Sequence, residues 1–207
     1  MIELNNVTIE LREPILQNAN YNFQTGRIYL LHALNGSGKT SVLRAIVSLI
    51  KPNQGNILFS GQTFDKVKQE VFYFETSDWF DNNLSGLDYL KFIKRQWNSN
   101  NQIDKEIDRW KMNDYVRLPI KKYSLGMKQK LLISMYSLSN AKYLLMDEIN
   151  NGLDESSRAI LYEELVHLAD QGKLVILASH YQSEIGNIID QALTIKDGKL
   201  IDIAPHN

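Results

Sequence analysis

The sequence predicts an α/β fold with a mostly parallel central sheet, an antiparallel β region at the N-terminus and an inserted helical segment. Short, continuous apolar runs are typical of buried parallel strands, and they occur at residues 28–31, 143–146 and 174–178. Apolar residues at helical spacing follow the first two of these runs. Between them, residues of about 78–140 look mainly helical and hold all three tryptophans of the chain.

The two ends of the chain have the patterns of antiparallel strands. Residues 2–23 carry short β-rich runs separated by turn residues, which predicts the antiparallel N-terminal region. Near the C-terminus, the apolar runs 193–195 and 200–203 flank Asp197-Gly198, a dipeptide that favours a tight hairpin turn. These patterns therefore predict an antiparallel region at the start of the sequence and a hairpin near its end.

Composition is that of an ordinary globular protein. The chain has 207 residues, 43% of them hydrophobic and 23% charged, with no cysteine and a formal net charge of -1. This charge does not attract nucleic acid, and the lysines between residues 121 and 130 are interpreted as a solvated helix face, so no nucleic-acid partner is expected. No signal peptide is recognised, and no apolar run approaches the roughly 18 residues that a membrane-spanning helix needs. If the chain serves a membrane, we expect it to do so through a partner.

A glycine-rich loop joins the first buried strand to a helix. Glycines let a backbone wrap a phosphate with its N–H groups inward, and the following helix presents its positive end to the same anion. The apolar positions after the loop continue at helical spacing as far as Lys51-Pro52. This arrangement predicts a phosphate-binding loop (P-loop) for ATP, in which Lys39 reaches the β- and γ-phosphates and the Thr40 hydroxyl binds Mg²⁺. The expected ATP-binding residues are Asn35, Gly36, Ser37, Gly38, Lys39, Thr40 and Ser41.

Two acids end the second buried strand. Asp147 is expected to hold Mg²⁺, and Glu148 to act as the general base for the attacking water. His180 directly follows the third buried strand, so it should lie at the same sheet edge, where ligands collect, and contact the γ-phosphate. Together with Lys39, the predicted catalytic residues are Glu148 and His180.

A further stretch, residues 123–131, resembles the signature of the ABC (ATP-binding cassette) ATPases, usually written LSGGQ. Ser124 and Gly126 match, whereas Leu125 and Met127 replace the usual Gly and Gln. A serine at this place can cap a helix whose N-terminus faces a phosphate. In the family that phosphate belongs to ATP on a second subunit, so the resemblance implies that Ser124 and Gly126 bind nucleotide across a dimer.

The resemblance extends along nearly the whole chain. Residues 151–154 look like the D-loop, which crosses the dimer interface in the family, and His180 matches the switch histidine. The chain is identified as a single ABC ATPase domain over 1–207, with a catalytic core at 1–77 and 141–207 and a helical subdomain at about 78–140. It is most similar to the ATPases of bacitracin-resistance and lantibiotic-immunity exporters.

Four slots depart from the family pattern. Ala33 replaces the first P-loop glycine, and residues 8–12 show no aromatic to stack on adenine. Ile149-Asn150 replace the Pro-Thr that follows the catalytic glutamate. At the Q-loop, Glu75 and Thr76 occupy the proline and glutamine slots. Thr76 is taken as a Mg²⁺ ligand and Glu75 as its alternative in a shifted register; whether hydrolysis or coupling slows is left open.

The resemblance also implies the partners. These are a membrane-spanning permease and a second ATPase subunit, with the chain cytoplasmic and peripheral on the inner face of the membrane. Trp79 and Phe80 are expected on a groove that receives the permease, whereas Tyr89, Phe92 and Trp97 are more readily explained as core. The predicted function is ATP hydrolysis that powers export of a peptide or drug-like substrate. The alternative is an ABC ATPase of cluster assembly, or a regulatory clamp, without a transport role.

Overall fold

The computed structural model describes residues 1–34, 36–179 and 185–203, and it confirms the predicted α/β fold. The central sheet has six strands, of which the first five are parallel and the last pair is antiparallel. In spatial order these strands are β5 (Val71–Tyr73), β6 (Tyr143–Asp147), β7 (Leu174–Ser179), β3 (Arg27–His32), β8 (Gln191–Lys196) and β9 (Lys199–Ile203).

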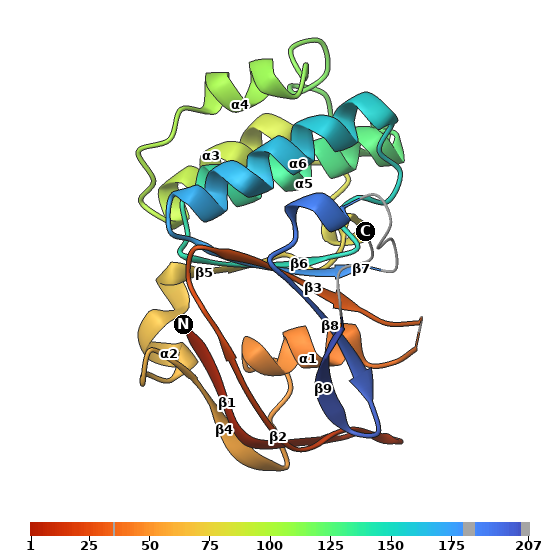
Figure 1. Cartoon of the computed structure of the whole chain (residues 1–207). Helices are drawn as coiled ribbons and strands as arrows, with labels where there is room; N and C mark the ends of the chain where they lie inside the picture. The colour runs from red at the N-terminus through yellow and green to blue at the C-terminus, as the bar shows by residue number, and fades with distance from the viewer. Residues whose placement is uncertain (35, 180–184, 204–207) are drawn as a thin grey trace.

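A second, antiparallel sheet lies below the first in Figure 1 and confirms the predicted N-terminal β region. Its strands are β2 (Pro14–Phe23), β1 (Ile2–Glu10) and β4 (Gln54–Phe59), in that order. Strand β4 was not anticipated, because its first three residues are polar or glycine. The Gln17 N–H donates to the Gly198 carbonyl at 2.7 Å, which ties β2 to the turn of the predicted hairpin β8–β9.

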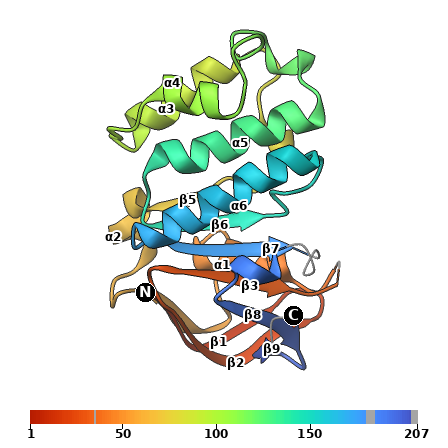
Figure 2. The same cartoon turned by 45° about the horizontal axis from the view of Figure 1, so that its top comes forward.

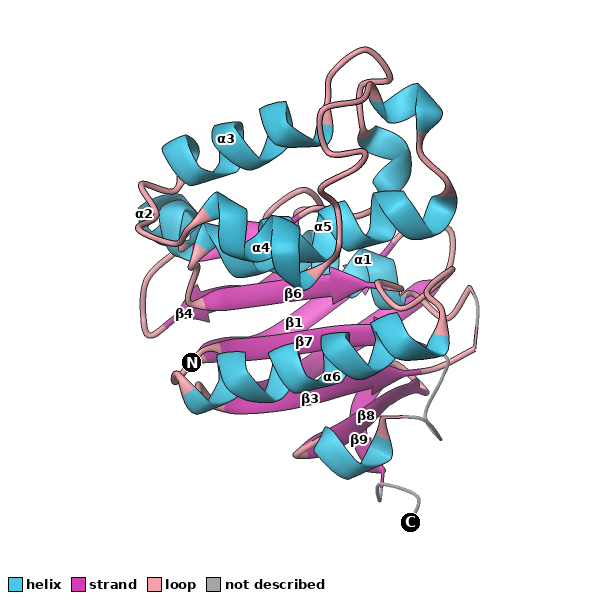
Figure 3. Cartoon of the chain, turned by 90° about the horizontal axis from the view of Figure 1, so that it is seen from above, coloured by secondary structure: helices cyan, strands magenta, loops and turns pink. Residues whose placement is uncertain are grey.

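The helices cover both faces of the central sheet. Helix α1 (Lys39–Ile46) lies between the two sheets, and the short α2 (Phe64–Val67) follows β4 (Figure 1). The opposite face carries α5 (Leu125–Ser139) and α6 (Glu155–Asp170), with α3 (Gly86–Gln96) and α4 (Ile103–Arg109) outside them (Figure 2). Seen from above, α6 lies over β7 and β3 and runs along them (Figure 3).

Alternating side chains of the buried strands supply two separate cores. In β3, Tyr29 and Leu31 belong to the cluster that contains α1, whereas Ile28 and Leu30 belong to the cluster that contains α5 and α6. Because successive side chains of a strand point to opposite faces, an uninterrupted apolar run is what a sheet covered on both faces requires. These two layers fix the strand ends that carry the functional residues.

Two helix starts agree with the sequence signals, whereas one helix end does not. Ser124 caps α5 and Asp154 caps α6, each accepting a hydrogen bond from a backbone N–H three residues on. Helix α1, however, ends at Ile46, although its apolar pattern continues to residue 50. The reason is local: Ser48 adopts a left-handed conformation (φ 58°), and the Leu49 N–H turns back to the Arg44 carbonyl at 2.8 Å.

Between β5 and β6 the chain forms helices α3, α4 and α5, where the inserted helical subdomain was expected. One continuous apolar cluster joins α3 and α5 to α6 and the sheet, so the division near residues 78 and 140 stays a prediction. Among the described residues, no helix combines the length and apolarity that crossing a membrane requires.

Candidate active site

The glycine loop turns the chain from β3 into α1. Gly38 has φ 97°, and a side-chain carbon there would lie 2.5 Å from Cγ2 of Ile15, so only glycine fits. Gly36 has φ 83° and nothing within 4 Å of where its side chain would be. Both conformations favour glycine, and the open space at Gly36 leaves the loop backbone accessible. Asn35 lies outside the described residues.

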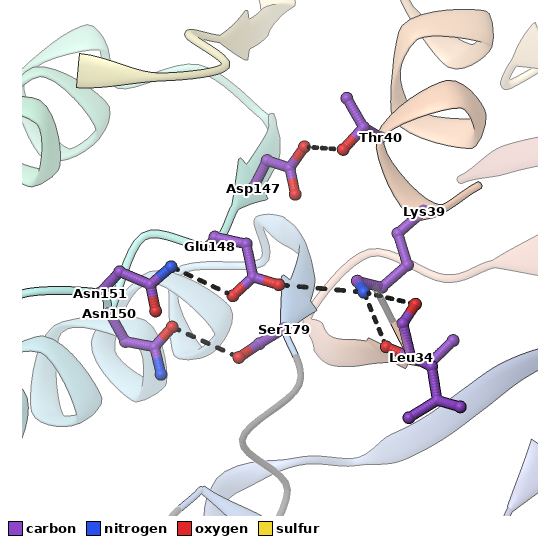
Figure 4. Close-up of polar contacts among 9 residues, drawn as sticks. Leu34, Lys39, Thr40, Asp147, Glu148, Asn150, Asn151 and Ser179 are labelled. Carbon is purple, nitrogen blue, oxygen red and sulfur yellow. Dashed lines mark hydrogen bonds and ion pairs between the residues drawn. The ribbon is translucent and has the colours of Figure 1, made fainter. Parts of the chain in front are cut away.

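Lys39 is the first residue of α1, and its side chain is buried (6% exposed). Its Nζ donates to the carbonyls of Ala33 at 2.7 Å and Leu34 at 3.3 Å, and lies 3.9 Å from Oε1 of Glu148 (Figure 4). A buried ammonium needs such oxygen partners, and phosphate oxygens are of the same kind. Ala33 is buried in this turn, so the methyl group that replaces the usual glycine is accommodated.

Asp147 ends β6 and faces Thr40. The Thr40 hydroxyl donates to Oδ2 of Asp147 at 2.6 Å (Figure 4), whereas Oδ1 is buried without a hydrogen-bond partner among the described residues. Burial raises the pKa of Asp147, and the Thr40 hydrogen bond opposes this shift. An unsatisfied buried carboxylate oxygen beside a hydroxyl is a good place for a hard cation such as Mg²⁺, so these residues fit the expected metal.

Glu148 follows in a left-handed conformation, φ 48°, that is rare for a residue with a side chain. Its N–H donates to the Ala178 carbonyl of β7 at 2.8 Å, which fixes the backbone here. Asn151 Nδ2 lies 3.5 Å from Oε2 of Glu148, on the side away from Lys39 (Figure 4). The carboxylate thus lies between an ammonium and an amide, which fix its orientation.

Two neighbouring hollows share the side chains of Thr40, Asp147 and Glu148. One of about 390 Å³ is lined by these three and by Gly36, Gly38, Lys39 and Ser41. The other, of about 360 Å³, is lined in addition by Glu75, Thr76, Ser77, Asp78, Leu125, Gln129, Leu132 and Asn151. The structure therefore brings the predicted phosphate, metal and base residues together, with Thr76 in the adjoining space.

Ser124 and Gly126 are not among the residues that line these two hollows. Ser124 is exposed and accepts a hydrogen bond from the Met127 N–H at 3.2 Å, and its own N–H reaches Sδ of Met127 at 3.4 Å. Leu125 packs on the D-loop instead: a side-chain carbon at Gly152 would lie 2.6 Å from Cδ2 of Leu125. The signature residues thus contact their own D-loop and leave Ser124 facing outward.

The Q-loop slots are occupied differently from the sequence expectation. Both oxygens of Glu75 accept hydrogen bonds from Arg44, at 2.5 and 2.6 Å, so this carboxylate does not face the site as a free ligand. Thr76 Oγ1 accepts from the Asp78 N–H at 3.2 Å and caps a short turn at Ser77–Trp79. Sequence reasoning missed Arg44; its place one helical turn after Thr40 was the signal available.

The aromatic residues in and after this turn correct two expectations. Trp79 is 51% exposed, as expected for a contact surface, but Phe80 is buried and stacks on Phe74 with ring centres 5.1 Å apart. Phe92, interpreted as core, is 58% exposed. Phe80 is held inside by its contacts with the Phe74 and Tyr89 rings, whereas α3 exposes the face that carries Phe92.

His180 lies outside the described residues. The residue before it, Ser179, ends β7 and donates to Oδ1 of Asn150 at 3.3 Å (Figure 4). Asn150 was treated as a tolerated departure; the structure gives it a contact that links the ends of β6 and β7.

Comparisons with known proteins identify a family. A family model described as ABC transporter matches residues 16–151. An uncharacterized ABC transporter ATP-binding protein of Bacillus subtilis, YybJ, is 32% identical, and the alignment covers 97% of this chain and 94% of the relative. The lantibiotic transport ATP-binding protein SrtF of Streptococcus pyogenes is 28% identical, over 92% of this chain and 84% of its own length.

Solved structures share the fold. An ATP-binding subunit of an ABC transporter superposes with a TM-score of 0.88 at 18% identity, covering 99% of this chain and 90% of its own. The cbiO1 protein of Clostridium perfringens, described as part of the ABC transporter complex cbiONQ, gives 0.79 at 20% identity, with coverage of 99% and 88%. At these identities the likeness concerns the fold alone.

Proposed function

This chain belongs to the ABC transporter family, as an ATP-binding subunit with ATPase activity, and we propose that it powers a separate membrane exporter. The observation that carries the proposal is the convergence of Lys39, Thr40, Asp147 and Glu148 on one pair of hollows. Lys39 and Thr40 begin α1, and Asp147 ends β6 with Glu148 directly after it. The exporter assignment is supported by relatives such as SrtF, whose name refers to lantibiotic transport.

Each residue has a chemical role in the proposed hydrolysis. The loop N–H groups and Lys39 bind the β- and γ-phosphates, and Thr40 and Asp147 hold Mg²⁺. Bound there, Mg²⁺ neutralises charge on the phosphate oxygens. Glu148 takes a proton from water while the water oxygen forms a bond to the γ-phosphorus. The bond between the γ-phosphorus and the β-phosphate oxygen breaks, and ADP and phosphate leave. His180 is proposed to contact the γ-phosphate, and Thr76 to contribute an oxygen on the metal side.

We further propose that two ATPase subunits act together. Ser124 caps α5 and Gly126 lies in its first turn, and the positive end of a helix favours an anion. They do not line the hollow that contains Lys39, which supports a role on ATP held by a second subunit, identical or related. The exposed side chains of Trp79 and Phe92 are proposed to contact the permease. The chain would then act on the inner face of the cell membrane.

The test is affinity purification of the tagged chain from detergent-solubilised membranes of its own host. We expect a multi-spanning membrane protein in near-equal amount. Trp79→Ala should reduce its recovery, whereas Val166→Ala, which truncates an exposed apolar side chain on α6, should not. Recovery of soluble partners alone would instead favour the cluster-assembly or regulatory-clamp reading, and unchanged recovery with Trp79→Ala would reject the contact surface.

A further inference from the structure

Helix α1 makes a second polar contact through Arg44, one helical turn after Thr40 at its N-terminal end. Thr40 and Arg44 are four residues apart and therefore lie on one side of the helix. Thr40 bonds to Asp147, whereas Arg44 reaches the segment that follows β5. Its Nε donates to Oε2 of Glu75 at 2.6 Å and its Nη2 to Oε1 at 2.5 Å. A displacement of α1 along or around its axis must therefore act on Glu75.

The ion pair between Arg44 and Glu75 has the geometry that makes such pairs effective. It is bidentate, and the Tyr73 hydroxyl donates a third hydrogen bond to Oε2 of Glu75 at 2.8 Å. The Glu75 side chain is 11% exposed and that of Arg44 41% exposed. The Arg44 hydrogen bonds hold the pKa of Glu75 below its usual value, so the carboxylate stays charged at neutral pH. Two donors on two carboxylate oxygens distinguish this contact from a pair held by a single hydrogen bond.

The residues on either side of Glu75 are fixed as well. The Phe74 N–H donates to the Tyr136 hydroxyl of α5 at 3.2 Å, and the same hydroxyl lies 3.3 Å from the Phe74 carbonyl. The Phe74 ring contacts that of Trp79, with centres 5.8 Å apart. Thr76 caps the turn that ends at Trp79. A short path of hydrogen bonds, backbone and one ring contact thus runs from Arg44 to the exposed Trp79.

We propose that Arg44 and Glu75 are positioning residues that transmit the position of α1, and hence occupancy of the phosphate site, to residues 74–79. This inference rests on the proposed function, because it takes ATP as the ligand at the N-terminus of α1. This link, the Arg44–Glu75 ion pair, carries a displacement of α1 to residues 74–79, because its charged hydrogen bonds hold the two side chains at a fixed distance. It needs no contact between residues 74–79 and the nucleotide.

The test is amide hydrogen exchange of residues 74–79 in the full-length chain, with and without Mg²⁺ and a non-hydrolysable ATP analogue. In the wild type, the analogue should slow exchange about fivefold or more, the lower end of typical coupling between two sites. Glu75→Gln and Arg44→Gln should bind the analogue but lose most of this slowing. The charge-swapped double variant, Arg44→Glu with Glu75→Arg, should recover part of it.

A matched control lies at the other end of the same strand. Glu70 precedes β5 and is 3.7 Å from Lys142, with both side chains about half exposed. Glu70→Gln removes an ion pair beside β5 without touching α1, so nucleotide-dependent slowing should persist. If Glu75→Gln keeps the slowing, or if Glu70→Gln loses it equally, the link is wrong. A wild-type chain that binds no analogue contradicts the proposed function itself, and the link with it.

Discussion

Two adjacent strands of the central sheet end in carboxylates with opposite surroundings. Strands β5 and β6 are parallel neighbours in register from Val71 opposite Tyr143, so their C-terminal ends lie at the same edge. Glu75 follows the first strand and Asp147 ends the second. Both lie beside helix α1, and both line the same hollow. Position in the fold alone would therefore give them the same role.

Their hydrogen bonds differ. Glu75 receives three donors, two from Arg44 and one from Tyr73, and its pKa is lowered chiefly by the Arg44 hydrogen bonds. Asp147 receives the Thr40 hydroxyl on one oxygen, has no partner among the described residues on the other, and has a pKa raised chiefly by burial. A carboxylate with both oxygens hydrogen-bonded to the protein anchors a segment, whereas a carboxylate with one oxygen lacking a partner is available for a cation. The partners of each acid distinguish the two roles.

The largest expected effect contrasts the two strand ends with the same substitution. Glu148→Gln removes the proposed base and should lower ATP turnover by about 10²–10⁴-fold, the range of general-base contributions, while ATP still binds. Glu75→Gln, at the neighbouring strand end, should change turnover by less than about tenfold because that carboxylate is bonded within the protein. Phosphate release and calorimetric ATP binding measure both variants. Equal losses of turnover in the two variants would contradict the different roles assigned to Glu148 and Glu75.

We also expect Gly152, in the loop after β6, to tolerate a side chain less well than a glycine in an open turn does. Gly152→Ala places a carbon 2.6 Å from Leu125 at φ 74°, and overpacking of this kind costs about 1–3 kcal/mol in unfolding free energy, besides the backbone strain. Denaturant unfolding measures it. Leu125→Ala in the same chain should recover part of the loss, because the clash is between these two side chains.

Gly172→Ala is the matched control for this effect. Gly172 has a similar φ of 81°, but nothing lies within 4 Å of where its side chain would be. It should therefore show the backbone strain alone. If Gly152→Ala and Gly172→Ala destabilise equally, the packing of the D-loop on the signature helix is not as tight as the geometry indicates.

The sequence was sufficient to predict the positions of candidate residues that local backbone or the ends of parallel strands determine. Lys39 and Thr40 follow from a glycine loop between a strand and a helix, and Asp147 and Glu148 from an apolar run that ends in acids. Strand β4 was missed because its polar start and its glycine give no alternating pattern. The side of a loop on which a side chain lies was equally unpredictable, as Phe80 demonstrates.

The contact of Arg44 with Glu75 was inaccessible for a different reason. The two residues are 31 positions apart, and their meeting depends on where α1 lies relative to β5. Local patterns specify each element but carry no information on such packing. Sequence reasoning therefore gave Glu75 a ligand role from its slot, and only its hydrogen-bond partners revealed an anchoring one.

Asp147→Asn should stabilise the nucleotide-free chain at neutral pH while it weakens Mg²⁺-dependent ATP binding. The folded-state pKa of Asp147 is raised, so its charged form opposes folding; this penalty is absent below the unfolded pKa, about 3.9, grows between the unfolded and the folded pKa, and is complete above the folded pKa. Removing the charge should gain about 1–2 kcal/mol at pH 7 and nothing near pH 3. Thermal unfolding across this range measures it, and a loss of stability at pH 7 would contradict the assignment.

Glu75→Gln should have the opposite sign and the smallest effect. The folded-state pKa of Glu75 is lowered, so its contribution is present above the unfolded pKa, about 4.3, and is lost as pH falls through the folded pKa. Because Arg44 is partly exposed, the variant should lose only about 0.5–1 kcal/mol at pH 7. The difference from the wild type should disappear in acid. If Glu75→Gln were more stable than the wild type at neutral pH, both strand ends would carry destabilising charges, and Glu75 would be a second unsatisfied acid instead of the anchor of its segment.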